Sequence, residues 1–122
     1  MIDFNKLYLS FHYALQGIKH AVKHDQNLRI HFAVAVLVVI ASIIFRVNPF
    51  EMGILGIMIL LVLAAEMINT AIEEMTDLIT NEHRKEAKTA KDVSAGMVLL
   101  IAIGSVVVGF LIFIPYIVRL FK

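Results

Sequence analysis

Residues Glu66 to Asp77 read EMINTAIEEMTD. It follows fourteen uncharged residues, Met52 to Ala65, and places polar side chains at spacings of three and four. On a helix at about 100° per residue these side chains lie within roughly 60° of one line, so three carboxylates, an amide and a hydroxyl share a face. They are Glu66, Asn69, Thr70, Glu73 and Asp77. The stretch therefore predicts a membrane helix with an acidic face.

The depth of this face follows from the uncharged run before it. Fourteen residues cover about 21 Å at about 1.5 Å per residue, against a hydrocarbon core of about 30 Å. We therefore expect Glu66 inside the membrane near one boundary, with Glu73 about 10 Å nearer to water. A carboxylate at the centre of a membrane helix costs about 2.5 to 3.5 kcal/mol, so acidic groups in a membrane usually have a functional role or a partner.

The composition agrees with a small membrane protein. Of the 122 residues, 60% are hydrophobic and 17% are charged, whereas soluble domains contain about 45 to 50% apolar residues. The length suits a single domain, residues 1–122. The absence of cysteine excludes disulfides, thiolate zinc sites and cysteine nucleophiles. The net charge of +1 gives no indication of a nucleic-acid partner.

Three uncharged runs predict membrane spans. We expect transmembrane helices at about 31–47, 50–79 and 93–118, the last containing twenty-six residues without a charge. Asn48-Pro49 predicts the turn between the first two spans, because proline disfavours helix in the residue before it. In the third span, Ser105-xxx-Gly109 is typical of helices that pack closely.

Two polar features precede the first span. Apolar residues recur at helical spacing over about 3–24, with lysines on the other faces. This pattern fits an amphipathic helix on an anionic membrane surface and, equally, a helix packed on its own protein. Residues His24 to His31, HDQNLRIH, then contain side chains able to bind metal or phosphate. Sequence physics alone favours a solvated hinge for this segment.

The basic residues predict the orientation in the membrane. Eight lysines and arginines lie in the amino-terminal segment and the second connection, against three on the other side. The positive-inside rule therefore places the amino terminus and the acidic face in the cytoplasm and the carboxyl terminus outside. The acidic face would then open toward the compartment that contains nucleotide.

The polar residues suggest several chemistries. Magnesium commonly uses one or two carboxylates plus substrate phosphates, which Glu73 with Asp77 or Asp25 could supply. Glu66 could accept a proton from a lipid hydroxyl, and Lys91 could stabilise charge on a transferring phosphoryl group. The sequence has no phosphate-loop motif and no E-x-x-H or H-E-x-x-H spacing. From the residues alone, an enzyme, a proton-coupled transporter and a structural oligomer held together by buried polar groups all stay open.

A longer pattern favours the enzyme. Glu66-x-x-Asn69-x-x-x-Glu73-x-x-x-Asp77, followed by Ala90-Lys91-Asp92, resembles the signature of the small prokaryotic integral-membrane lipid kinases. These are the diacylglycerol kinase and undecaprenol kinase family, and the similarity runs over nearly the whole chain. The stretches NLRIH and AKDVSAG look more like the undecaprenol kinases of Gram-positive bacteria than the diacylglycerol kinases of Gram-negative ones.

The resemblance implies an all-α membrane protein with an amino-terminal surface helix and three transmembrane helices. It implies a homotrimeric helical bundle in the cell inner (cytoplasmic) membrane, with active sites between subunits. The implied reaction is phosphorylation of a lipid alcohol by ATP with magnesium, with undecaprenol as the first candidate and diacylglycerol as the alternative. A small proton-coupled transporter is the alternative outside the enzymes.

The resemblance also implies roles for individual residues. Glu66 would be the catalytic base, and Asn69 a polar partner that orients the site. Glu73 would be a magnesium ligand, and Asp25 stands where the family has a second metal-binding glutamate. Aspartate is one methylene shorter, so the metal geometry there is expected to differ. The residues implied at the nucleotide are Tyr13, Glu82, Lys91, Asp92 and Lys6.

Overall fold

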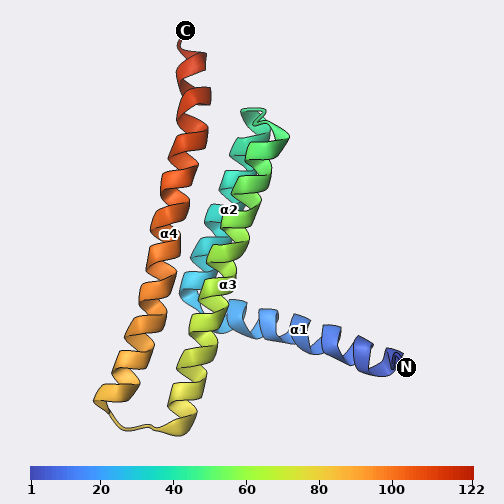
Figure 1. Ribbon diagram of the computed structural model, residues 1–122, viewed down its shortest axis with the longest axis vertical. Coiled ribbons are helices and arrows are strands. Elements are labelled where there is room, and N and C mark those ends of the chain that lie inside the picture. Colours follow the sequence, from blue (N-terminus) through green and yellow to red (C-terminus); the bar gives the residue numbers. More distant parts are fainter.

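The computed structural model describes all 122 residues as four helices without a strand. The helices are α1 (Phe4–His24), α2 (Gln26–Ile44), α3 (Pro49–Ile79) and α4 (Lys85–Leu120). Figure 1 shows α2 and α3 as a close hairpin, α4 along another side of α3, and α1 projecting sideways from the other three. The predicted all-α class is confirmed.

Helix α3 is the centre of the arrangement, because every other helix contacts it. Helix α4 packs along α3, and no Cα atom of α4 comes within 8 Å of α2. Side chains bridge part of this gap, as where the rings of Phe45 and Phe113 meet edge to face at 6.1 Å. The acidic face of α3 is therefore flanked by α2 and α4.

Side-chain caps determine where the first three helices begin. Asp3, Asp25 and Asn48 each accept hydrogen bonds from backbone N–H groups in the first turn of the helix that follows. Pro49 occupies the first turn of α3, where its missing N–H costs nothing. The turn predicted at Asn48-Pro49 is present.

The segment expected to be a polar hinge is mostly helical. Only Asp25 separates α1 from α2, and helix continues from Gln26 through His31. The reason is the Asp25 carboxylate, which satisfies the N–H groups of Asn27 and Leu28 at 2.8 and 3.3 Å. Helix α2 therefore begins five residues before the span expected at about 31–47.

The turn from α2 to α3 closes with a Schellman motif. The N–H of Val47 donates to the carbonyl of Ser42, and the N–H of Arg46 donates to that of Ile43. Arg46 adopts φ 53°, the one positive φ in the chain. Glycine is usual at this position because other residues are strained there. Val47 is buried in the turn.

A hydrogen-bond clamp ties this turn to the end of α4. The hydroxyl of Tyr116 donates to Oε2 of Glu51 at 2.6 Å and accepts the backbone N–H of Asn48 at 3.1 Å. A hydroxyl bonded to a carboxylate is among the stronger hydrogen bonds in proteins. The clamp therefore holds α3 and α4 together at the end of the bundle opposite the α3–α4 connection.

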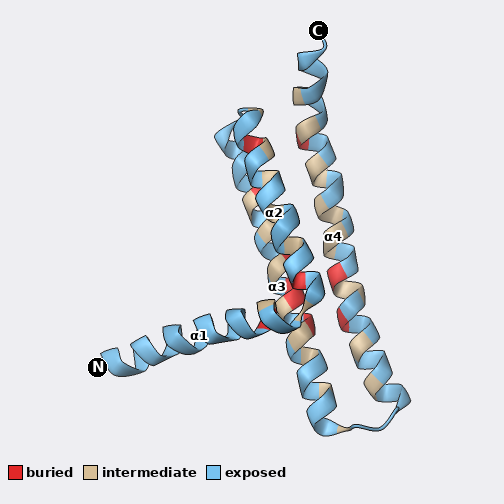
Figure 2. Cartoon of the chain, turned by 180° about the vertical axis from the view of Figure 1, so that it is seen from behind, coloured by how far each residue is buried: buried red, intermediate tan, exposed pale blue.

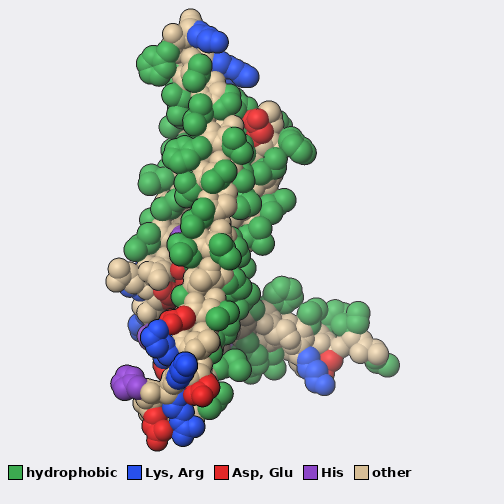
Figure 3. All heavy atoms as spheres, turned by 60° about the vertical axis from the view of Figure 1, so that its left-hand side comes forward, with side chains coloured by type: hydrophobic (Ala, Val, Ile, Leu, Met, Phe, Trp, Pro, Cys, Tyr) green, Lys and Arg blue, Asp and Glu red, His purple; other side chains and the backbone are tan.

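Helices α2, α3 and α4 are each long and apolar enough to cross a membrane. Helix α4 begins at Lys85, eight residues before the expected span at 93, so its first two turns are polar. Hydrophobic side chains cover the length of the bundle, whereas most charged ones gather at the end with the α3–α4 connection and a few lie at the opposite tip (Figure 3). The chain is a multi-pass membrane protein.

Few residues are buried within one chain. Only 12 of 122 are buried, and they lie on the inward sides of the helices and where α1 joins them (Figure 2). A side-chain carbon added to Gly109 would meet no atom within 4 Å. The Ser105-xxx-Gly109 pair therefore brings no two helices of this chain together, and whether it packs against another subunit stays a prediction.

Candidate active site

The polar face of α3 changes from buried to exposed along the helix. Glu66 and Asn69 are buried at 2% and 7% exposure, whereas Glu73 and Asp77 are exposed. Glu74, which the helical spacing places off this face, pairs instead with His20 of α1 at 3.2 Å. The side chains on the face contact α2 and α4, so the site is formed by three helices.

The side chain of Glu66 makes a single polar contact. Its Oε1 atom lies 3.3 Å from Nε2 of His31 on α2. Its Oε2 atom is buried and has no hydrogen-bond partner. Buried polar atoms are nearly always paired, so this unpaired oxygen calls for an explanation. Two turns of helix separate it from the exposed Glu73.

Asn69 links α3 to α4. The hydroxyl of Ser94 donates to Asn69 Oδ1 at 2.5 Å, and Asn69 Nδ2 donates to Glu73 Oε1 at 3.2 Å. Ser94 is buried and also lies 3.0 Å from the carbonyl of Lys91. The amide therefore holds Glu73 in one orientation relative to α4.

Asp25 reaches the same face from the corner between α1 and α2. Its Oδ2 accepts the hydroxyl of Thr70 at 2.7 Å, while Oδ1 caps α2. Asp25 and Glu73 both line a polar pocket of about 300 Å³, here called the acidic pocket. All eight residues around it are polar or charged: His24, Asp25, Gln26, Asn27, Thr70, Glu73, Glu74 and Asp77.

The donors of the acidic pocket fit magnesium. Its carboxylate, amide and hydroxyl oxygens are the ligands that hard cations prefer. No three histidine or acidic side chains in the chain are close enough together to hold a metal ion unaided. Magnesium usually completes its coordination with water and substrate phosphates, so one or two carboxylates suffice. Glu73 and Asp25, the two metal ligands expected from the sequence, thus line the same pocket.

A second polar pocket of about 660 Å³ surrounds the connection between α3 and α4, and we call it the loop pocket. It meets the acidic pocket at Asp77, which lines both. Lys91 Nζ donates to Asp77 Oδ1 at 2.6 Å. Four other charged side chains here form two pairs, Arg84 with Glu82 and Lys88 with Asp92. Glu82, Lys91 and Asp92, expected at the nucleotide, all line this pocket.

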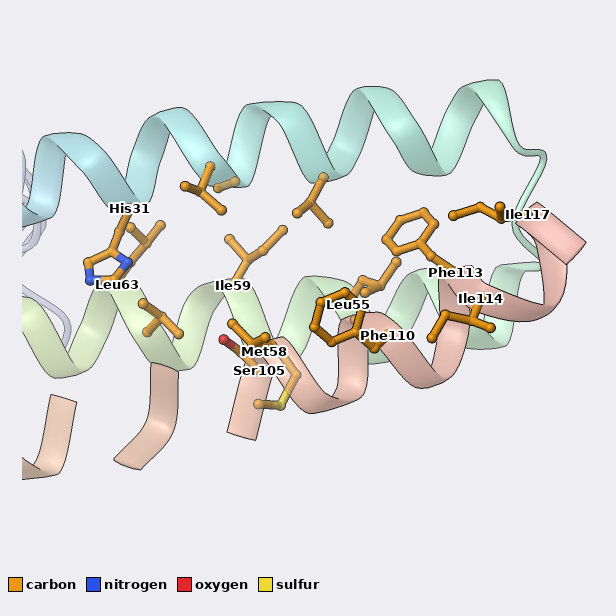
Figure 4. Close-up of a pocket in the computed structure, with 16 residues that line it drawn as sticks. His31, Leu55, Met58, Ile59, Leu63, Ser105, Phe110, Phe113, Ile114 and Ile117 are labelled. Atoms are coloured by element: carbon orange, nitrogen blue, oxygen red, sulfur yellow. The ribbon is translucent and has the colours of Figure 1, made fainter. Parts of the chain in front are cut away.

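An apolar cavity of about 420 Å³ fills the space between α2, α3 and α4 (Figure 4). Of its 16 lining residues, 13 are hydrophobic. His31 lies at one end and Ile117 at the other. The cavity thus leads from near the Tyr116 clamp to the side chain that contacts Glu66.

Two residues expected at the nucleotide are not near the others. Lys6 and Tyr13 lie on α1, which projects away from the bundle (Figure 1). Tyr13 is 62% exposed, and no hydrogen bond or ion pair joins either side chain to α3 or α4. Within one chain, therefore, the site contains seven of the nine residues singled out from the sequence.

Comparison with known proteins identifies the kind of site. The sequence profile of the family described as "Prokaryotic diacylglycerol kinase" matches residues 12–113. The chain belongs to this family. Members phosphorylate lipids, so the chain is a lipid kinase and ATP is its phosphoryl donor. The family expected from the sequence is confirmed, and a transporter is no longer needed to explain Glu66.

Individual members of the family resemble the chain over most of its length. An undecaprenol kinase of Bacillus subtilis (strain 168) is 36% identical over 93% of this chain and 92% of its own. A diacylglycerol kinase of Synechocystis sp. is 37% identical over 89% of this chain and 63% of its own. A diacylglycerol kinase of Haemophilus influenzae is 30% identical over 83% of this chain and 86% of its own.

The contacts of three residues in the site were not predicted from the sequence. Thr70 was placed on the acidic face, but its bond to Asp25 depends on the corner between α1 and α2. Ser94 was one helical turn after Lys91 in AKDVSAG, and that spacing was the available signal. His31 was assigned to a solvated hinge, and nothing in its local pattern indicates the contact with Glu66.

Proposed function

We propose that this lipid kinase is an undecaprenol kinase that transfers the γ-phosphoryl group of ATP to the hydroxyl of a polyprenol. The observation that carries the proposal is Glu66, a buried carboxylate with an unpaired oxygen. It contacts His31 of the apolar cavity and shares a face of α3 with Thr70 and Glu73 of the acidic pocket. Similarity to the Bacillus subtilis undecaprenol kinase over nearly the full length of both chains supports the choice of lipid.

In the proposed reaction Glu66 is the general base. Its Oε2 accepts the hydroxyl proton while the lipid oxygen forms a bond to the γ-phosphorus of ATP. The bond from that phosphorus to the bridging oxygen breaks, and ADP leaves with the electron pair. Such transfers need mainly positioning and charge stabilisation. A site shared by three helices is therefore sufficient.

The two polar pockets are proposed to bind different parts of magnesium ATP. Glu73 and Asp25 are the proposed magnesium ligands, and Asn69 orients Glu73. Bound magnesium would neutralise charge on the phosphates. Lys91 is proposed to bind phosphate, which requires it to share or exchange its bond with Asp77.

The loop pocket is where the rest of the nucleotide is proposed to lie. Glu82 and Asp92 line it beside Lys91. Lys6 and Tyr13 are proposed to join the nucleotide from a neighbouring subunit, because α1 carries them away from the pockets of its own chain. This division fits the homotrimer with shared active sites.

The orientation in the membrane determines the side from which each substrate reaches the site. We propose the cell inner membrane with a cytoplasmic amino terminus, because most basic residues lie at that end. In this orientation ATP reaches the polar pockets from the cytosol. The lipid enters sideways, with part of its chain in the apolar cavity and its hydroxyl near Glu66. Helix α1 lies on the cytoplasmic surface of the membrane.

Diacylglycerol is the second candidate substrate, because two similar family members are diacylglycerol kinases. The test is phosphorylation by the purified protein in lipid vesicles, with magnesium ATP and either undecaprenol or diacylglycerol at equal mole fractions. We expect kcat/KM to be at least tenfold higher for undecaprenol, a difference of about 1.4 kcal/mol in transition-state binding. A preference for diacylglycerol would reverse the assignment. Phosphorylation of neither lipid would refute both.

Glu66→Gln tests the base on the same preparations. The amide is isosteric and removes a buried charge, so folding should be kept. Turnover should fall about 10²- to 10⁴-fold with little change in the KM for ATP. A folded Glu66→Gln protein that retains most of its phosphoryl-transfer rate would show that Glu66 is not the base.

A further inference from the structure

His31 lies between the apolar cavity and the buried carboxylate, a position that no role assigned above explains. Its side chain is 24% exposed and that of Glu66 is 3% exposed. The imidazole lines the cavity on one side, and its Nε2 is 3.3 Å from Glu66 Oε1 on the other. A lipid hydroxyl that arrives from the cavity would therefore meet His31, with the Glu66 carboxylate directly behind the imidazole.

No other side chain is available to orient Glu66. Asn69 uses its oxygen for Ser94 and its nitrogen for Glu73. Asp25 uses both oxygens, one for the start of α2 and one for Thr70. The polar groups nearest in sequence and in space are thus committed elsewhere, and the orientation of the Glu66 carboxylate depends on His31.

The two oxygens of Glu66 differ for this reason. Oε1 faces the imidazole nitrogen, and Oε2 is buried without a partner. The two oxygens of a carboxylate are chemically equivalent, so a half turn about the last bond leaves the arrangement unchanged. An imidazole that donates from Nε2 fixes the plane of the carboxylate instead, and a neutral imidazole with its hydrogen on Nε2 is sufficient. One oxygen is then held toward His31 and the other is left free of a protein partner.

We propose that His31 is a positioning residue for the base: it holds Glu66 Oε1 so that Oε2 is presented to the lipid hydroxyl at the end of the apolar cavity. This inference rests on the proposed function. His31 gains and loses no proton in the step. Its contribution is to keep Oε2 in place for proton transfer, and the groups that support a reacting residue in this way typically change activity about 10- to 100-fold.

The test compares two replacements of His31 that differ in one property. His31→Phe keeps a planar ring and removes the donor, and we expect kcat to fall about 10- to 100-fold while the KM for ATP stays within about twofold. His31→Gln carries an amide N–H at a reach similar to that of Nε2, and it should restore kcat to within about threefold of the parent.

A double-mutant cycle separates positioning from a structural role. In the Glu66→Gln background no carboxylate is left to orient, so adding His31→Phe should lower kcat no further. An equal loss in both backgrounds would overturn the proposal, because it would mean that His31 acts through folding or elsewhere. So would His31→Phe with the turnover of the parent, or His31→Gln as inactive as His31→Phe.

His20→Phe is the matched control. His20 makes the same kind of contact, 3.2 Å from Glu74, but both side chains are largely exposed, and Glu74 lies two turns of α3 beyond Glu66. Its turnover should equal that of the parent, and a loss as large as that of His31→Phe would also overturn the proposal. A parent protein that phosphorylates no lipid alcohol would instead refute the proposed function, so the two failures are distinguishable.

Discussion

Replacing Asn69 with leucine should separate the geometry of the metal site from the stability of the bundle. Leucine has a similar size and keeps neither of the two hydrogen bonds of the amide, one to Ser94 at 2.5 Å and one to Glu73 at 3.2 Å. Each such bond contributes about 0.5 to 1.5 kcal/mol to stability. The two together set a range of about 1 to 3 kcal/mol for the loss.

The structure places the loss in the lower part of this range. The Ser94 hydroxyl keeps an acceptor, the carbonyl of Lys91 at 3.0 Å, so no buried donor is left unpaired. Glu73 is exposed, and water replaces the amide as its partner. We therefore expect the free energy of unfolding to fall by about 1 to 2 kcal/mol, and the protein to remain folded.

The effect on the metal should be larger than the effect on stability. Glu73 loses the amide that fixes its orientation, and the loss of such a supporting contact weakens metal binding about 10- to 100-fold. The assay is lipid phosphorylation in vesicles at saturating ATP, and the readout is the magnesium concentration that gives half-maximal turnover. We expect that concentration to rise by the same factor.

Ser94→Ala is the control for Asn69→Leu. It removes the bond from α4 and leaves the Asn69–Glu73 bond in place, so the magnesium requirement should change by less than about threefold. The reasoning would be refuted by a folded Asn69→Leu protein with the magnesium requirement of the parent. It would also be refuted if Ser94→Ala raised the requirement as much as Asn69→Leu does.

Further predictions concern the metal, the topology and the clamp. Glu73→Gln should abolish most magnesium-dependent ATP binding, because the amide keeps the shape and loses the charge; equilibrium binding of magnesium ATP equal to that of the parent would exclude Glu73 as the ligand. A reporter fused after Lys122 should behave as extracytoplasmic, and cytosolic activity would contradict the three-span topology. Tyr116→Phe should lower the free energy of unfolding by about 1 to 2 kcal/mol without changing turnover, since the clamp lies far from Glu66. Arg46→Gly should raise the thermal midpoint by relieving the positive φ, and a lower midpoint would show that the Arg46 side chain contributes more than the strain costs.

The sequence was sufficient for the main features of the fold. Uncharged runs long enough to cross a membrane predict three helices, and Asn48-Pro49 predicts the one tight turn between them. The residues at which the helices begin were harder to predict from the sequence, because hydropathy indicates the membrane span and not the ends of the helix. Asp25 begins α2, and Lys85 begins α4, in polar segments where capping and helix propensity decide.

The site was predictable along α3 and less so across the helices. Spacings of three and four place Glu66, Asn69 and Glu73 on one face without knowledge of the fold. The partner of Glu66 could not be found in this way, because His31 is on another helix and its position depends on how α2 packs against α3. The absence of Lys6 and Tyr13 from the pockets has the same cause, since the direction of α1 is a tertiary property.

The carboxylate of Asp25 is proposed to bind a cation and also stabilises the corner between α1 and α2, and these two functions affect each other. Its oxygens start α2 and tie that helix to Thr70 of α3, and a cap of this kind is worth about 0.5 to 2 kcal/mol. A cation that coordinates Asp25 must share these oxygens, so its affinity includes the cost of loosening the corner. Thermodynamic linkage makes the effect reciprocal. In the proposed site, a change in the tilt of α1 would therefore change the affinity for the cation, and cation binding would change the tilt of α1 by the same free energy.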